Sequence, residues 1–178
     1  MRKYKKPIED SERIINNAER SREKTMHRAV RLLAAKPRSV GELRKRLLEK
    51  VWTNAEIVDA VIEKLKDYKY LDDGQFARDT ALSKLRQRPQ GKLKLIFAMS
   101  RKELSKEDVE SAVNTAFEQM PEADLLEKAI KKRLRLSGKP ETREETKKLY
   151  DHLMRKGFSY GLIREKMEDV SKFFEDEE

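Results

Sequence analysis

Seven basic side chains and no acidic one lie between Thr80 and Lys102 of this 178-residue chain. The seven are Lys84, Arg86, Arg88, Lys92, Lys94, Arg101 and Lys102. A group of cations without interspersed carboxylates attracts polyanions, and the formal net charge of the whole chain is +9. We therefore expect these residues to contact phosphate groups or the acidic face of a partner protein. The alternative is that they form only a solvated face of a basic protein.

No residue pattern typical of catalysis or metal binding accompanies this basic group. The chain has no cysteine, and its two histidines, His27 and His152, do not stand at a metal-binding spacing from another ligand. Asp72 and Asp73 are adjacent carboxylates that could bind magnesium, but their place before a predicted helix favours N-capping. A Gly-rich phosphate loop is also missing. We expect no catalytic residue, no metal and no cofactor, and hence no enzyme activity.

The elements that position the basic residues can be inferred from a pattern that recurs three times. Lys50-Val51-Trp52-Thr53 is matched 52 residues later by Lys102-Glu103-Leu104-Ser105, and a further 54 residues on by Lys156-Gly157-Phe158-Ser159. Each copy predicts the end of one helix, a short turn with a large apolar residue, and a hydroxyl N-cap for the next helix. An acidic residue three positions later, Glu56 or Asp108, completes a predicted capping box in the first two copies. In the third copy the glycine is expected to adopt the left-handed conformation that ends many helices.

A helical pattern that repeats about every fifty residues predicts a modular array, in which neighbouring units complete each other's cores. We expect an all-α fold of three tandem three-helix repeats in an extended, curved modular array, with an N-terminal helical arm. The repeats are expected at residues 25–71, 72–120 and 121–174, between a basic, partly helical arm (1–24) and an acidic tail (175–178). The helix of the arm is expected to begin near Asp10, with Ile14 inward, and to continue unbroken until Pro37 stops it.

Composition agrees with an array of small helical units. Charged residues make up 42% of the chain and hydrophobic residues 37%, which is a low apolar content for one thick globular core. No segment is apolar for long enough to span a bilayer, and the charged N-terminus lacks the apolar region of a signal peptide. The lack of cysteine permits a reducing compartment. We expect a monomeric, cytoplasmic protein with no membrane partner.

The helix, turn and helix of each repeat could also suggest a protein that reads DNA bases. A reading helix presents Arg, Asn or Gln near its amino end, where side chains reach the base edges. The helices that follow the three turns begin instead with Asn54-Ala55-Glu56, Lys106-Glu107-Asp108 and Tyr160-Gly161-Leu162. Acidic residues at two of these three ends would face phosphate, so we do not expect these helices to recognise bases.

Several stretches of the chain resemble the RecX family, the regulators of the RecA recombinase. They are Ala29-Val30-Arg31-Leu32-Leu33, Ser39 with Glu42-Leu43-Arg44-Lys45-Arg46-Leu47, Val61-Ile62-Glu63-Lys64-Leu65, Tyr70-Leu71-Asp72-Asp73 with Phe76-Ala77, and Lys156-Gly157-Phe158-Ser159-Tyr160 with Ile163. The similarity covers about residues 25–170, and Tyr-Leu-Asp-Asp followed by Phe-Ala is its most specific part. In the second repeat, Ala98-Met99 and Lys102-Glu103-Leu104 stand where the family usually has Glu-Leu and Lys-Gly-Ile, so a C-cap glycine is missing there.

The resemblance implies an all-helical protein of three three-helix repeats. It also implies a regulator that lies along the groove of a RecA filament on DNA, bridges protomers, and suppresses strand exchange, ATP hydrolysis and coprotease activity. The partners would be the RecA filament and DNA, contacted directly or within the filament. The charge alone supports a different hypothesis, a stand-alone helical DNA-binding protein that acts through its basic surface. A third hypothesis is a scaffold that assembles other proteins on its helix faces.

Overall fold

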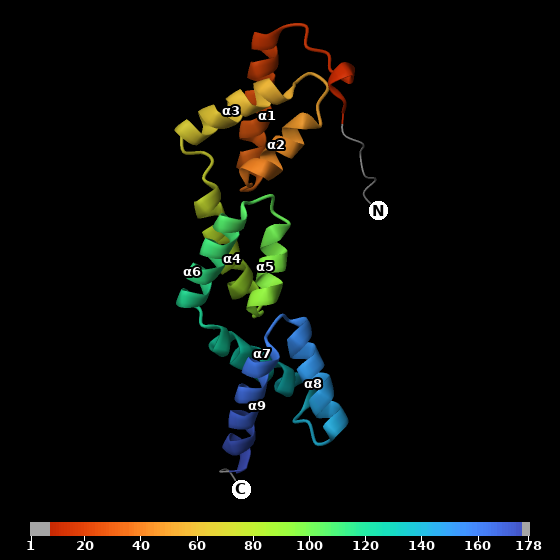
Figure 1. The fold of residues 1–178 in the computed structure, drawn as a ribbon, viewed down its shortest axis with the longest axis vertical. Coiled ribbons are helices and arrows are strands. Elements are labelled where there is room, and N and C mark those ends of the chain that lie inside the picture. The colour runs from red at the N-terminus through yellow and green to blue at the C-terminus, as the bar shows by residue number, and fades with distance from the viewer. Residues whose placement is uncertain (1–7, 176–178) are drawn as a thin grey trace. The chain divides into compact units, whose positions relative to one another are not determined.

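The computed structural model describes residues 8–175 of the chain. Across that range the backbone forms one 3-10 turn, η1 (Asp10–Glu12), and nine α-helices, without any strand (Figure 1). The predicted all-α class is therefore confirmed. Residues 1–7 of the expected arm and residues 176–178 of the expected acidic tail lie outside the described part. Contacts group the chain into two units: unit 1 ends at Phe76 and also includes Lys102–Leu104, and unit 2 comprises Ala77–Arg101 and the chain from Ser105 onward.

Unit 1 contains three helices that all contact one another, α1 (Ala18–Ala35), α2 (Val40–Leu48) and α3 (Ala55–Asp67). Apolar side chains recur along these helices at three- and four-residue steps, so each helix turns one apolar face inward. The buried ones form a single core of Ala29, Leu43, Leu47, Val58, Val61, Ile62, Leu65 and Leu71. The next helix, α4 (Asp73–Gln87), begins in unit 1 and continues in unit 2.

The first long helix starts later than the sequence pattern predicts. The expected start near Asp10 is wrong, because α1 begins at Ala18, where the Asn17 side chain accepts a hydrogen bond from the Arg20 amide at 2.9 Å. Ile14 is 62% exposed rather than buried. The chain before α1 is held by Arg13, whose guanidinium donates to the carbonyl of Thr53 at 2.7 Å. A side-chain cap and this long-range hydrogen bond thus override the local apolar periodicity.

The three matching turns do not cap their helices in the same way. Ser105 and Ser159 are N-caps as predicted, since their hydroxyls accept hydrogen bonds from the backbone amides three residues later at 3.0 and 3.3 Å. The prediction for Thr53 is wrong. Asn54 caps α3 instead, and its side chain accepts from the Ile57 amide at 2.9 Å.

Thr53 has a different structural role. It is fully buried, and its hydroxyl lies 3.0 Å from the hydroxyl of Thr25, which itself donates to the carbonyl of Ser21 at 2.7 Å. A buried hydroxyl without a partner would cost free energy, so Thr53 satisfies a polar group inside the core of unit 1. Thr53 can fill this role because the side chain of the next residue, Asn54, caps α3 in its place.

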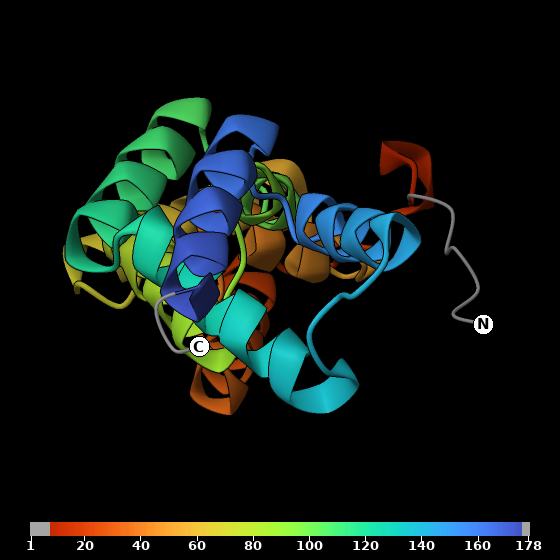
Figure 2. The same ribbon diagram turned by 90° about the horizontal axis from the view of Figure 1, so that it is seen from below.

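Unit 2 contains the rest of α4 together with α5 (Lys92–Ser100), α6 (Lys106–Gln119), α7 (Glu122–Ser137), α8 (Arg143–Arg155) and α9 (Tyr160–Glu175). α5 packs against α6, and α7, α8 and α9 contact one another. These last three helices run in three different directions (Figure 2). Phe158, in the turn between α8 and α9, is the largest fully buried side chain of the described residues.

Two segments of unit 1 that are distant in the sequence form hydrogen bonds with the amino end of α2. The backbone amide of Val40 donates to the Asp73 carboxylate at 2.8 Å, and the Ser39 hydroxyl donates to the carbonyl of Lys102. Asp72 caps α4 by accepting from the Gln75 amide at 2.8 Å. Both aspartates are therefore used at helix amino ends, in agreement with the predicted capping function.

Glu103 takes the place of the missing C-cap glycine without changing the turn to another type. Its φ is 54°, in the left-handed region that Gly157 also occupies with φ 88° at the matching position of the third turn. The Glu103 carboxylate forms an ion pair with Lys45 at 2.9 Å, with both side chains largely exposed. An L-residue in this region is strained, so the sequence departure carries a conformational cost.

We expect Glu103→Gly to stabilise unit 1 by about 0.5–1 kcal/mol. Relief of the left-handed backbone contributes ~1–2 kcal/mol, which exceeds the unfolded-state entropy of glycine and the weak exposed ion pair. Urea unfolding followed by fluorescence of Trp52, the single tryptophan, measures the change within unit 1. Lys45→Ala is the control for removal of the ion pair, and a Glu103→Gly variant less stable than that control would contradict the assignment of strain.

Candidate functional site

An open, basic hollow of about 510 Å³ lies within unit 2. Its walls come from the carboxyl end of α4, the turn after it, one side of α5, and the residue that follows α8. The lining residues are Lys84, Gln87, Arg88, Pro89, Gln90, Lys94, Phe97, Ala98, Arg101 and Lys156. Five of them are cations and none is acidic, so the arrangement can attract an anion from solvent.

Helical spacing explains which cations reach the hollow. Lys84 and Arg88 are four residues apart at the end of α4, where the Arg88 amide still donates to the Lys84 carbonyl at 3.1 Å. Lys94 lies on α5 and Arg101 is the residue that ends this helix, seven positions later. Side chains seven apart lie on the same face of a helix. Pro89 ends α4 and turns the chain, so the basic face of α5 lies beside that of α4.

The structure brings together four of the seven basic residues selected from the sequence. Arg86 is exposed on α4 but does not line the hollow, and the ammonium of Lys92 donates to the Asn114 side chain at 3.1 Å. Lys102 belongs to unit 1, where its ammonium pairs with Glu42 at 3.2 Å and lies 6.0 Å from the ring centroid of Phe76. These three residues therefore have surroundings distinct from the hollow.

Lys156 is a cation of the hollow that sequence reasoning missed. The chain carries it there because the carbonyl of Lys156 accepts a hydrogen bond from the Gly91 amide at 2.9 Å, across 65 residues. A Cβ atom on Gly91 would lie 2.2 Å from the carbonyl oxygen of Gly157, so only glycine permits this approach. The signal in the sequence is the match of Lys156 to Lys102 and Lys50, which by itself indicates only turn chemistry.

The concentration of positive charge lowers the pKa of basic side chains in and beside the hollow. The pKa of Lys156 is lowered, first by partial burial and then by the charges of Lys94, Lys132 and Arg88. The pKa of His152, one turn earlier on α8, is lowered by burial and then by Lys156 and neighbouring basic residues. An anion bound in the hollow would relieve this mutual repulsion.

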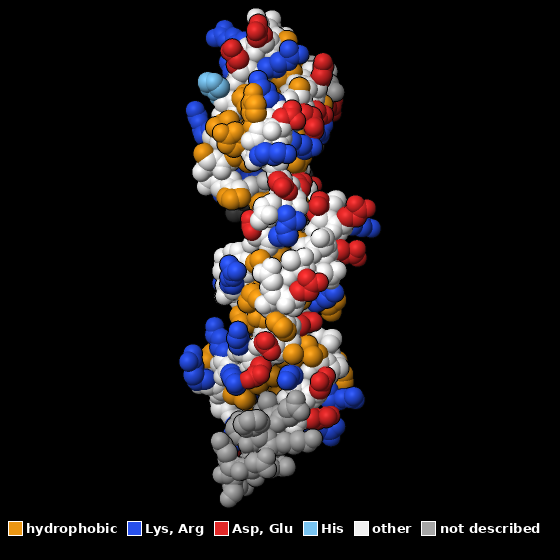
Figure 3. All heavy atoms as spheres, turned by 90° about the vertical axis from the view of Figure 1, so that its left-hand side faces the viewer, with side chains coloured by type: hydrophobic (Ala, Val, Ile, Leu, Met, Phe, Trp, Pro, Cys, Tyr) orange, Lys and Arg blue, Asp and Glu red, His pale blue; other side chains and the backbone are white. Residues whose placement is uncertain are grey.

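The five cations keep their charge uncompensated by carboxylates. Among the described side chains, none of the five forms an ion pair. Lys94 and Lys156 donate to backbone carbonyls, those of Arg155 at 3.2 Å and Pro89 at 3.4 Å, which are neutral partners. The face drawn in Figure 3 carries basic and acidic side chains interspersed. The lining of the hollow differs from that mixed-charge face because it contains no carboxylate.

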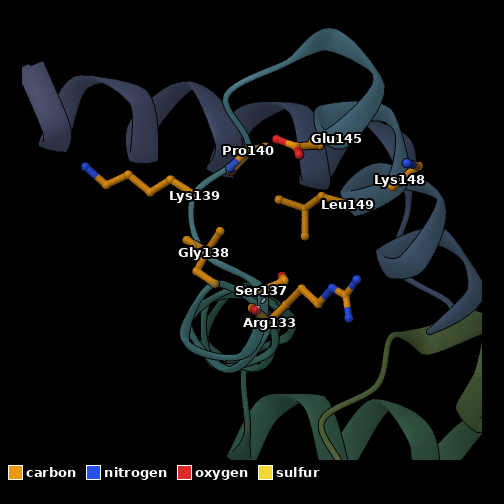
Figure 4. A pocket seen from close by; sticks show the side chains of 9 residues that line it. Arg133, Ser137, Gly138, Lys139, Pro140, Glu145, Lys148 and Leu149 are labelled. Atoms are coloured by element: carbon orange, nitrogen blue, oxygen red, sulfur yellow. Dashed lines mark hydrogen bonds between the residues drawn. The ribbon is translucent and has the colours of Figure 1, made fainter.

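A second, smaller hollow of about 210 Å³ lies where the loop after α7 returns to α8. Leu149 points into it, whereas Lys139 extends away from it (Figure 4). The Glu145 carboxylate on its rim accepts a hydrogen bond from the Glu141 amide at 2.9 Å. With an apolar floor and charges of both signs on the rim, this hollow is explained by loop packing.

Other classes of site find no support in the part of the chain that the structure describes. No three His, Cys, Asp or Glu side chains of residues 8–175 gather where they could hold a metal ion. No helix of that part is long and apolar enough to cross a membrane.

Family models match two parts of the chain. The model described as RecX, first three-helix domain, matches residues 26–65, and that of RecX, third three-helix domain, matches residues 121–167. A curated relative from Prosthecochloris aestuarii, named regulatory protein RecX, is 31% identical over 83% of this chain and 93% of its own length. The regulatory protein RecX of Treponema pallidum is 31% identical over 76% of this chain and 79% of its own length.

Solved structures show the same fold. A crystal structure of RecX from Lactobacillus salivarius matches 86% of this chain and 98% of its own length, with a TM-score of 0.76 and 18% identity. A second structure, of a regulatory protein RecX, matches 81% of this chain and 71% of its own length, with a TM-score of 0.70 and 24% identity. The predicted all-α helical repeat fold is thereby confirmed.

Proposed function

Because this chain belongs to the RecX family, as its 31% identity to a RecX protein over most of both chains shows, we propose that it regulates the RecA recombinase. In this proposal it binds along the groove of the RecA filament on DNA and suppresses strand exchange, ATP hydrolysis and coprotease activity. The relatives are named regulatory proteins, so the role is a regulatory one that needs no catalytic residue or cofactor. Family membership is the observation that carries the proposal.

The basic hollow supports a contact with DNA phosphate or an acidic filament surface. Its five cations have no carboxylate partner among the described side chains, so binding an anion does not first require breaking ion pairs. The tandem helical units that family models recognise suit binding to a polymer, since repeats stack into long binding surfaces. We propose that the protein acts in the cytoplasm, where RecA and its DNA are located.

The RecA proposal is tested on the DNA-dependent ATP hydrolysis of RecA. We expect the purified chain to lower this rate at amounts equal to or below that of RecA. A variant with Lys84, Arg88, Lys94 and Arg101 changed to Gln should need roughly 10- to 100-fold more protein for the same effect, because each exposed ion pair with the filament contributes about 0.5 kcal/mol. An unchanged ATPase rate with the unmodified chain would exclude this function.

A matched control removes the same charge elsewhere in unit 2. Arg86, Lys92, Lys106 and Lys128 are exposed and lie outside the hollow, so their joint change to Gln lowers the net charge equally. We expect this control to inhibit RecA like the unmodified chain. Equal weakening in the two variants would assign the effect to net charge rather than to the hollow.

The second candidate function is stand-alone DNA binding through the same basic surface. The observation that favours it is the exposed aromatic ring of Phe97 among the cations of the hollow, because such a ring offers a contact to bases as well as phosphates. Binding to naked DNA in the absence of RecA, with a steep dependence on salt, tests this candidate.

A further inference from the structure

Phe97 lies on α5 without contributing to the hydrophobic core. Its side chain is 64% exposed, whereas Leu95 and Met99 on the same helix are fully buried. α5 is therefore anchored by its other face, and the ring of Phe97 is left at the wall of the hollow. Single exposed apolar side chains are common on protein surfaces. What distinguishes this ring is that it lines a concave surface together with five cations.

Five cations from three segments of unit 2 line the same hollow as this ring. Lys94 precedes Phe97 by three residues on α5, so these two side chains share one face of the helix. Arg101 follows Phe97 by four residues, at the carboxyl-terminal cap of α5, and lines the same hollow. Lys84 and Arg88 come from α4, and Lys156 comes from the turn after α8. The lining also includes Gln87 and Gln90, whose amides can both donate and accept hydrogen bonds. The hollow thus offers phosphate contacts, a stacking surface and polar groups for base edges.

We infer that this hollow binds single-stranded nucleic acid, with a base stacked on Phe97 and phosphates held by the five cations. The inference rests on the second candidate function above, direct DNA binding, and it does not require RecA. A duplex keeps its bases paired and stacked, so it can use the cations but not the ring. Single strands offer unstacked bases, and aromatic side chains bind these in proteins that prefer them.

The walls of the hollow are held together before any ligand arrives. The hydrogen bond of 2.9 Å from the Gly91 amide to the Lys156 carbonyl joins the start of α5 to the turn after α8. The backbone there is packed so closely that a Cβ on Gly157 would lie 2.5 Å from the backbone nitrogen of Lys94. The backbone segments that carry Lys156 and Lys94 are therefore held at a set separation, which lowers the entropy cost of binding. A volume of about 510 Å³ also falls in the range of roughly 300–1,000 Å³ common for ligand sites.

An acidic, apolar protein segment is the competing occupant. Leu93 is 66% exposed and precedes Phe97 by four residues on α5, so the two could form one apolar strip for a partner protein. Leu93 does not line the hollow, however, whereas Phe97 lines it together with the five cations. A variant at each position therefore separates stacking inside the hollow from general apolar contact on α5.

The test measures binding of fluorescent oligonucleotides by the purified full chain without RecA. Three probes share one length: a single strand, its duplex, and a strand whose central nucleotides lack bases. We expect Phe97→Leu to weaken binding of the single strand by roughly 5- to 100-fold, and to change binding of the duplex and the abasic strand by less than about twofold. Phe97→Tyr, which keeps an aromatic ring, should restore most of the affinity.

Leu93→Ala is the matched control and should leave all three affinities unchanged within about twofold. Because Phe97 is exposed, its variants should keep the circular dichroism spectrum of the unmodified chain. Equal weakening of the single strand and the abasic strand by Phe97→Leu would refute stacking. Weakening by Leu93→Ala as large as that by Phe97→Leu would also refute the inference, because it would show general apolar contact along α5 rather than stacking inside the hollow. Failure of either kind leaves the RecA proposal standing, since no RecA is present.

Salt dependence tests the phosphate contacts separately. For single strands the logarithm of affinity falls with that of salt by ~0.7 for each phosphate contacted. Five cations thus predict a slope of about −3.5 if each holds one phosphate. Changing Arg88 and Arg101 to Gln should reduce the slope by about 1.4, whereas changing the exposed residues Arg86 and Lys92 should not alter it. The same slope in both double variants would remove the hollow as the phosphate site.

Discussion

A Gly157→Ala variant is expected to lose about 2–5 kcal/mol of the free energy of unfolding of unit 2. Gly157 has φ 88°, and an alanine in the left-handed region costs ~1–2 kcal/mol. The new Cβ would also lie 2.5 Å from the backbone nitrogen of Lys94, and such overpacking costs typically ~1–3 kcal/mol more. Urea unfolding followed by far-UV circular dichroism measures the loss.

Gly138→Ala is the control that separates these two costs. Gly138 also has a positive φ of 77°, but nothing lies within 4 Å of a Cβ built there. Its ψ of 176° places it in a positive-φ region that is almost exclusive to glycine. We expect it to lose only this conformational part, ~1–3 kcal/mol. If the two variants lose equal stability, the close contact between the turn after α8 and α5 does not contribute, and the fixed placement of Lys156 is contradicted.

Phe158→Ala is expected to have a comparable or larger effect, a loss of about 3–5 kcal/mol. Phe158 is fully buried, and it follows Gly157 in the turn that presents Lys156 to the hollow. Removing the ring leaves a cavity that the surrounding helices cannot fill completely. Denaturant unfolding measures the loss, and the variant should also bind single-stranded DNA more weakly because the wall that carries Lys156 loses its support.

Phe97→Ala provides the comparison within the same unit and for the same side chain. Phe97 is 64% exposed, so its removal should change the free energy of unfolding by less than about 0.5 kcal/mol. The two phenylalanines should therefore separate stability from binding. A large loss of stability in Phe97→Ala would mean that the ring packs against the rest of unit 2. Weaker DNA binding by Phe97 variants could then result from unfolding rather than from lost stacking.

Much of the fold could be predicted from local patterns. The apolar periodicity and the recurring turns predict the helices, and Ser105, Ser159 and the left-handed Gly157 stand as predicted. These features depend on hydrogen bonds between residues that are close in the chain, so a short stretch of sequence is enough to predict them. The proposed repeat boundaries at residues 25–71, 72–120 and 121–174 rest on the same patterns.

Predictions failed where a distant group competes with the local one. Thr53 matches the other hydroxyl caps in sequence, but its hydroxyl is hydrogen-bonded to that of Thr25, a buried residue 28 positions earlier in the chain. Ile14 follows the apolar period of a helix, yet the backbone there is held in an irregular path by hydrogen bonds from Arg13 to the carbonyls of Lys50 and Thr53. Neither partner can be identified from spacing, because both depend on how helices pack.

The candidate site divides in the same way. The absence of acidic residues from Thr80 to Lys102 is a property of the sequence, and it is enough to predict an anion-binding region. Which cations share one hollow depends on helix packing: Lys84, Arg88, Lys94 and Arg101 do, while Lys102 pairs with Glu42 in unit 1. Lys156 joins them only because the backbones of Gly91 and Gly157 pack without side chains between them. Charge is a sum over residues, whereas a binding surface requires that residues distant in the chain be brought within reach of one ligand.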